Sequence, residues 1–193
     1  MRFPAETPSN SPLALAAMQH YLLGAMQARV GIRRRDTQIF SPVFSEDGPH
    51  IRLCTGGGYA VLSPRAAQHW PAAVIELAHE TVHLLDPEAG YTNYFEEGIG
   101  VAFEVEMALM LTDYDRSASI RGAYEVAWRT VSALPGGAYS AASSVRQRCG
   151  ALRGLSYAEA VLLFPRHDTD ELEVLVSTCV PRAMRDPAFG GPP

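Results

Sequence analysis

The 193-residue sequence contains no lysine, so its 16 basic residues are all arginines, against 21 acidic residues. The formal charge of −5 and the isoelectric point near 5.7 argue against a nucleic-acid-binding protein, because neutralising phosphates requires a surplus of cations. No apolar run approaches the ~20 residues of a membrane-spanning helix. The first residues do not form an export signal, since Glu6 lies where a leader is positively charged. We therefore expect a cytoplasmic protein that binds neither nucleic acid nor membrane.

Cysteine is also scarce. Cys54, Cys149 and Cys179 are widely separated, which fits neither a disulfide framework nor a Cys-x-x-Cys metal site. We expect three reduced, buried thiols. The glycine triplet 56–58 belongs to neither a Gly-x-Gly-x-x-Gly fingerprint nor a P-loop, so no nucleotide site is predicted there.

The composition, 47% hydrophobic and 19% charged, is typical of a globular protein long enough to bury one core. Because no repeat or long linker divides the chain, we predict a single domain over residues 1–193, with flexible tails at 1–10 and 187–193. The predicted fold class is α+β, with a small three-stranded sheet near the front and helices behind it. The predicted strands are 38–44, 50–55 and 59–63, the last two joined by the glycine triplet, and the predicted helices are 11–31, 70–86, 94–111, 120–134, 139–152, 157–164 and 170–184.

The segment 76–86 contains the pattern His-Glu-x-x-His, formed by His79, Glu80 and His83. Residues four apart on a helix lie one turn apart on the same face, so both imidazoles can bind one metal ion. Glu80 lies between them in angle, close enough to reach a water on that metal without being a ligand itself. Apolar residues on the opposite face, including Leu77, predict a helix that is buried on one side and faces a cleft on the other.

Two adjacent glutamates compete to be the third ligand, since a catalytic zinc ion usually has three protein ligands and one open position. If Asn93 is the N-cap of the next helix, Glu96 is its third residue, and its carboxylate folds back to the backbone N–H of the cap. Glu97 is then free, and we favour it over Glu96 as the ligand. The small residues Gly98 and Gly100 allow two helices to approach each other closely.

Two stretches of the sequence, His-Glu-Thr-Val-His at 79–83 and Glu-Gly-Ile-Gly at 97–100, resemble the gluzincin metallopeptidases. The resemblance covers about residues 11–112 and implies a zincin-like catalytic core, followed by an all-helical extension over 113–186. It also implies that His79, His83 and Glu97 bind Zn²⁺ and that Glu80 is the general base. In that mechanism the base accepts a proton from the metal-activated water and delivers it to the leaving amine of a peptide or protein substrate.

Further side chains are candidates for supporting such a site. Asp86, three residues after His83, could accept the second N–H of that imidazole, which is the usual way of orienting a metal-bound histidine; an exposed acid before a proline is the alternative. Glu76 and Glu104 are weaker candidates for the same role. The candidate hydrogen-bond donors to a tetrahedral intermediate are Tyr91, Tyr94, Tyr139 and His167.

Two other functions stay open at this point. A zinc-binding pseudo-peptidase or regulatory protein would hold a partner through the same fold without catalysis, and a metal-free helical interaction protein would contain the motif by accident. The distribution of charge favours a metal site. Between Arg65 and Arg116 the sequence has ten acidic residues and, apart from histidine, no basic one. This acidic central segment is where we expect a divalent cation.

Overall fold

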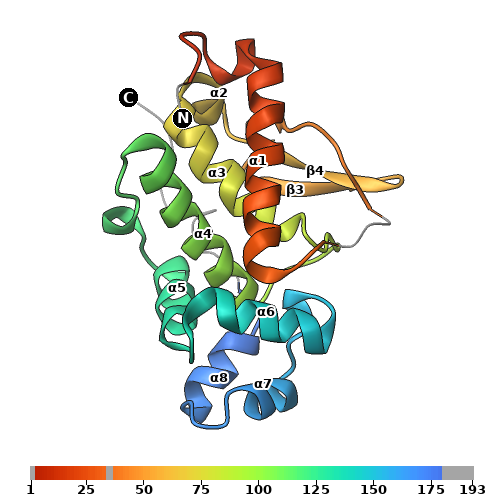
Figure 1. Cartoon of the computed structure of the whole chain (residues 1–193), viewed down its shortest axis with the longest axis vertical. Coiled ribbons are helices and arrows are strands. Elements are labelled where there is room, and N and C mark those ends of the chain that lie inside the picture. Colours follow the sequence, from red (N-terminus) through yellow and green to blue (C-terminus); the bar gives the residue numbers. More distant parts are fainter. Residues whose placement is uncertain (1–2, 34–36, 180–193) are drawn as a thin grey trace.

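The computed structural model describes residues 3–33 and 37–179. Within these ranges the protein is α+β, with eight α-helices and one four-stranded sheet (Figure 1). The strands are β1 (Gln38–Ile39), β2 (Val43–Phe44), β3 (His50–Cys54) and β4 (Gly57–Leu62). The helices are α1 (Pro12–Val30), α2 (Pro64–Gln68), α3 (Trp70–His83), α4 (Tyr94–Thr112), α5 (Ala123–Ala133), α6 (Gly137–Cys149), α7 (Tyr157–Leu163) and α8 (Thr169–Val176).

The helices pack around α3 and α4, which share the most extensive helix contact in the described part of the chain. In Figure 1 the β3–β4 hairpin projects to one side of α1, α4 and α5 lie on the other side, and α6, α7 and α8 form one end of the molecule. The buried apolar cluster is continuous and draws on α1, α3, α4 and the helices after α5. Across the described ranges, none of the helices combines the length and the apolar character that a membrane crossing requires.

The sheet has one more strand than predicted. The segment 38–44 forms two short strands, β1 and β2, which both pair in parallel with the same edge of β4. Pro42 lies between them and cannot donate to a strand ladder. The predicted hairpin of β3 and β4 is confirmed as an antiparallel pair. Only Gly56 takes the turn conformation, with φ of 80°; Gly57 belongs to β4, where an added Cβ would lie 2.1 Å from the carbonyl oxygen of Gln38.

Three helices end three or more residues earlier than predicted. Helix α6 ends at Cys149 rather than at residue 152, and Gly150 after it takes a left-handed conformation with φ of 82°. Helix α3 ends at His83 rather than at residue 86, because the chain tightens into a turn with Leu85 N donating to Val82 O, ahead of a proline that disfavours helix in the residue before it. Helix α8 ends at Val176. Ser177 is extended, with φ of −70° and ψ of 153°, and the rest of the predicted helix, 180–184, lies outside the described residues.

The described part of the first ten residues, 3–10, is held against the rest of the protein, contrary to the prediction of a flexible tail over 1–10. The ring of Phe3 stacks on Trp70 with a centroid separation of 5.2 Å, and Trp70 Nε1 donates to the backbone oxygen of Glu6 at 2.9 Å. Residues Pro8–Asn10 form a 3₁₀ turn before α1. The other predicted tail, 187–193, lies outside the described residues.

The start and the surroundings of α4 agree with the sequence prediction. Asn93 Oδ1 accepts a hydrogen bond from the backbone N–H of Glu96 at 2.9 Å, which confirms the N-cap. A Cβ at Gly100 would lie 2.9 Å from His79 Cε1 on α3, and one at Gly98 would lie 2.4 Å from the backbone oxygen of Ala127 on α5. The two glycines therefore let α4 approach two different helices.

Candidate metal centre

Three side chains from α3 and α4 converge in the interior. The candidate ligand atoms of His79, His83 and Glu97 all lie within 4.8 Å of one another, and all three residues are buried. His79 Nε2 is 3.1 Å from Glu97 Oε2, and His83 Nε2 is 3.7 Å from Glu97 Oε1. The cluster forms because the two histidines share one face of α3, while Gly100 lets α4 bring Glu97 against that face.

Each histidine is held from behind by a second carboxylate. His79 Nδ1 lies 3.0 Å from Glu104 Oε2, and His83 Nδ1 lies 2.8 Å from Glu96 Oε1. Because an ionised carboxylate accepts, each Nδ1 donates to the carboxylate behind it, and each Nε2 is the nitrogen directed at Glu97. This is the arrangement in which a metal-bound histidine is usually oriented. The structure thus places Glu104 where the sequence proposed it as a supporting residue.

Glu96 does not fold back to its own helix cap as predicted. Its carboxylate instead accepts from His83 and from Arg153, whose Nε and Nη2 lie 3.0 and 3.1 Å from its two oxygens. Arg116 pairs with Glu104 in the same way, with Nε 3.1 Å from Oε1. Both arginines follow α4 in the chain, so the region after residue 112 supplies the cations that hold the two orienting carboxylates.

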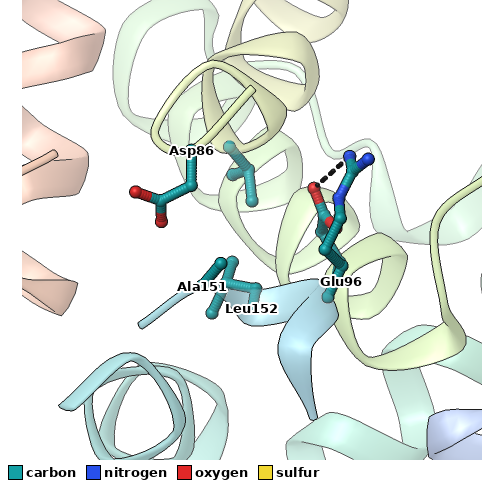
Figure 2. Close-up of a pocket in the computed structure, with 6 residues that line it drawn as sticks. Asp86, Glu96, Ala151 and Leu152 are labelled. Carbon is teal, nitrogen blue, oxygen red and sulfur yellow. Dashed lines mark hydrogen bonds and ion pairs between the residues drawn. The ribbon is translucent and has the colours of Figure 1, made fainter. Parts of the chain in front are cut away.

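Asp86 does not orient His83, which corrects the sequence prediction. It is 6% exposed, so it is not a surface acid either, and its two oxygens pair with Arg146 at 2.8 and 3.1 Å. Figure 2 shows the carboxylate of Asp86 pointing away from Glu96 across a small pocket. This pocket has no room for a water-sized ligand, and we assign it no binding role. Arg146 also donates to the backbone oxygens at the end of α1, and these hydrogen bonds fix the position of its guanidinium group.

Glu76 has a structural role at the start of α2. Its carboxylate accepts from the backbone N–H of Ser63 at 2.7 Å and from the Ser63 hydroxyl at 2.6 Å, so it fixes the N-cap of α2 and orients neither histidine. Glu76 and Ser63 meet because Ser63 directly follows β4 and lies beside the first turns of α3.

The candidate oxyanion donors are scattered. The side chain of Tyr91 is 77% exposed in the loop before α4. Tyr94 is half-buried at the first position of α4, where its backbone N–H donates to Ser177 O at 3.1 Å. The Tyr139 hydroxyl donates to Glu106, and Nε2 of His167 lies 2.8 Å from Oε2 of Glu171. The Tyr139 hydroxyl is thus engaged away from the histidine cluster, whereas His167 Nε2 is buried beside Glu171 without a hydrogen bond to any described residue.

Glu80 is the acidic residue of the centre whose side chain pairs with no other described residue. It is 4% exposed, and its carboxylate accepts no hydrogen bond from any residue that the structure describes. Burial raises the pKa of Glu80 to about 7, although the neighbouring His83 and His79 oppose that rise. A carboxyl group with a pKa near the working pH is well suited to accept and return a proton.

Tyr124 of α5 is a member of the site that the sequence did not reveal. Its ring meets the His79 imidazole edge-on, with centroids 5.6 Å apart. Burial and the nearby carboxylates of Glu97, Glu80 and Glu104 raise the pKa of Tyr124 strongly, so its hydroxyl keeps its proton and can act as a donor. In the sequence Tyr124 is one apolar position of an amphipathic helix, and no local signal distinguishes it from a core residue.

The centre has an excess of negative charge when its histidines are neutral. Four buried carboxylates, those of Glu80, Glu96, Glu97 and Glu104, face two guanidinium groups. When Glu80 is ionised and the histidines are neutral, four negative charges less two positive ones leave a surplus of two. Buried charges are costly unless compensated. One dication would cancel this surplus, and two imidazoles with one carboxylate form a donor set suited to zinc.

When no cation compensates this surplus of negative charge, it raises the pKa values of the two histidines. Burial lowers the pKa of His79, but the carboxylates of Glu104 and Glu97 outweigh burial and raise that pKa well above its usual value. His83 shows the same competition, with Glu97 and Glu96 raising its pKa. In return, burial of Glu97 is outweighed by His83 and His79, which lower its pKa to about 2. Protons on the imidazoles thus replace the charge that a metal ion would supply.

No protein-family model, no curated protein and no solved structure matches this chain. Its function is therefore inferred from the residues of the metal centre. Two histidines, a glutamate and an adjacent unpaired carboxylate can bind a Lewis-acidic metal ion and move a proton beside it.

The orienting role of Glu104 can be measured. Glu104→Gln removes the negative charge behind His79, so we expect zinc affinity to fall by about 10- to 100-fold, the usual effect of losing such a partner. The matched control is Glu106→Gln, which removes a carboxylate from the same helix that pairs with Arg29 instead. Competition with a chromophoric chelator gives both affinities. Equal affinities in the two variants would show that Glu104 does not support the site.

Proposed function

We propose that this protein is a zinc-dependent metallopeptidase with a zincin-like core, of the kind found in gluzincins. The observation that carries the proposal is the cluster of His79, His83 and Glu97, in which each imidazole is held by a buried carboxylate and Glu80 is left unpaired beside them. The short distances within this cluster argue against the metal-free interaction protein, because an accidental motif would not require Glu97 beside both imidazoles.

The proposed roles follow from position. His79, His83 and Glu97 hold the zinc ion, while Glu104 and Glu96 fix the two imidazole rings. When bound, zinc acidifies a water molecule and polarises the peptide carbonyl. Glu80 accepts the proton from the attacking water and returns it to the leaving amine. The hydroxyl of Tyr124, which stays protonated, is our candidate donor to the negative charge that develops on the carbonyl oxygen.

The substrate class that we propose is a peptide or protein, and the proposed location is the cytoplasm. Cys54, Cys149 and Cys179 are all free thiols, which suits a reducing compartment. Of the three, only Cys179 is buried, whereas Cys54 is exposed. The prediction that all three thiols are buried was therefore wrong.

A non-catalytic zinc protein is the second candidate, and one observation favours it. The three ligands and Glu80 are between 4% and 7% exposed, so a polypeptide cannot reach them without some movement of the structure. Such a protein would bind zinc through the same residues and hydrolyse nothing.

Peptidase assays with controlled metal content separate the two candidates. The zinc-loaded protein should hydrolyse an unstructured polypeptide, a strong chelator should stop the reaction, and added zinc should restore it. Mass spectrometry of the products identifies the bonds that are cleaved. Stoichiometric zinc without any cleavage would support the non-catalytic candidate, and cleavage that persists after zinc removal would contradict the proposed mechanism.

A further inference from the structure

The proposed active site is closed, and this inference rests on the proposed function. Glu80 is 4% exposed, and the ligands His79, His83 and Glu97 are 7%, 5% and 6% exposed. A general base must come within hydrogen-bonding distance of the reacting water beside the substrate. Some part of the covering structure must therefore move before a polypeptide can be cleaved.

One part of the cover, α5, is firmly fixed. It contributes Tyr124, which packs on His79, and it meets α4 where Gly98 leaves room for the backbone of Ala127. Ala127 and Val131 are fully buried in this contact. Moving α5 would expose a large apolar interface, so we do not regard it as the part that opens.

A second segment beside the ligands is Ser177–Cys179, which we call the strap. It leaves α8 in an extended conformation and pairs antiparallel with the residues that precede α4, through the bridge between Thr178 and Asn93. Two backbone hydrogen bonds hold it: Tyr94 N donates to Ser177 O at 3.1 Å, and Cys179 N donates to Thr92 O at 2.8 Å. The strap is therefore attached at the very start of the helix that carries Glu97.

One side chain of the strap reaches inward. Cys179 is 1% exposed, whereas Ser177 and Thr178 face solvent. Burial and the carboxylate of Glu97 raise the pKa of the Cys179 thiol to about 12. Thr92, which accepts the hydrogen bond from the strap, also donates its hydroxyl to Glu97. The strap thus covers the Glu97 side of the centre.

We propose that the strap is a displaceable cover of the metal centre, and that its release from residues 92–94 admits the substrate. Among the described residues, two backbone hydrogen bonds and the buried Cys179 side chain attach the strap, far less than the contact that holds α5. Release frees the carbonyl of Thr92 and the N–H of Tyr94, and an extended peptide can satisfy both groups by adding a strand in place of the strap. The substrate and the strap then compete for the same backbone.

Proline variants test this cover. Cys179→Pro removes the N–H that donates to Thr92 O, and with it one of the two attachments. Thr178→Pro is the matched control, because the N–H of Thr178 makes no hydrogen bond among the described residues and the extended Ser177 tolerates a following proline. Cys179→Ala controls for loss of the thiol while it keeps the N–H.

We expect Cys179→Pro to speed both the extraction of zinc by a chelator and the hydrolysis of an unstructured polypeptide by about fivefold over both controls, which corresponds to one lost backbone hydrogen bond. Equal rates in Cys179→Pro and Thr178→Pro would contradict the proposal that the strap covers the metal centre. Faster zinc extraction without cleavage in any variant would support the cover and contradict the peptidase proposal, so the two failures are distinguishable.

Hydrogen exchange in the unmodified protein gives an independent test that needs no variant. If the strap detaches by itself, the amide of Cys179 exchanges much faster than that of Leu175, which is fully buried in α8. Equal exchange rates of the two amides would mean that the strap opens only together with α8, and the proposal would be wrong.

Discussion

Glu80→Gln is expected to lower the rate of peptide hydrolysis by about 10²- to 10⁴-fold, the usual contribution of a general acid–base residue. Glutamine has nearly the same shape as glutamate but cannot accept the proton of the attacking water. Because Glu80 is not one of the three clustered ligands, the variant should keep its zinc. The measurement combines kcat/KM for a peptide substrate with the zinc content of the same sample.

Glu76→Gln provides the control for this experiment. It removes a carboxylate from α3 one helical turn earlier, where the side chain caps Ser63, so activity should stay within a few-fold of the unmodified protein. Comparable rates for Glu80→Gln and the unmodified protein would rule out Glu80 as the base, even if zinc is bound.

His83→Ala is expected to abolish stoichiometric zinc binding. It removes a proposed ligand, so the loss in affinity should exceed the roughly 100-fold limit for residues that only orient a ligand. It also removes one partner from each of the buried carboxylates of Glu96 and Glu97, which keep only Arg153 and His79, respectively, as charged partners. Breaking a buried ionic contact in this way costs about 3–5 kcal/mol, so the free energy of unfolding of the zinc-free protein should fall as well.

His20→Ala is the control for the loss of an imidazole. His20 is exposed on α1, and its removal should change neither the zinc content nor the denaturant midpoint. Zinc titrations and urea unfolding curves of both variants give the comparison. A His83→Ala protein that binds zinc as tightly as the His20→Ala protein would exclude His83 as a ligand.

The close approach of His79, His83 and Glu97 could be predicted because each step is local. The spacing of four within α3 puts the two imidazoles on one face, and Asn93 as N-cap fixes the rotation of α4 that presents Glu97. Gly100 then removes the steric barrier between the helices. These signals lie within a few residues of the side chains that they position.

The partners of the neighbouring acids could not be predicted, because they come from distant parts of the chain. Glu96 is drawn to His83 by Arg153, 57 residues later, and Asp86 is drawn away from it by Arg146, 60 residues later. The capping prediction for Glu96 used only neighbouring residues, so it could not take the charge of Arg153 into account. Tyr124 and the strap could not be predicted for the same reason, because they are distant from the ligands in the sequence and only the fold brings them near.

Three buried acids of the acidic central segment pair with arginines from the chain that follows it. Arg116, Arg146 and Arg153 each pair with a buried acid of this segment, respectively Glu104, Asp86 and Glu96. The helical region after residue 112 therefore completes the charge balance of the centre as well as packing against it. Of the four buried glutamates of the centre, Glu80 and Glu97 have no arginine partner among the described residues.

Zinc content is the most direct test of the account. The purified protein, incubated with zinc and then freed of unbound metal, should retain about one zinc ion per chain when measured by elemental mass spectrometry. The binding should be lost in His83→Ala and kept in Glu80→Gln. Absence of bound zinc in the folded, unmodified protein would contradict the metal centre, and with it the proposed peptidase.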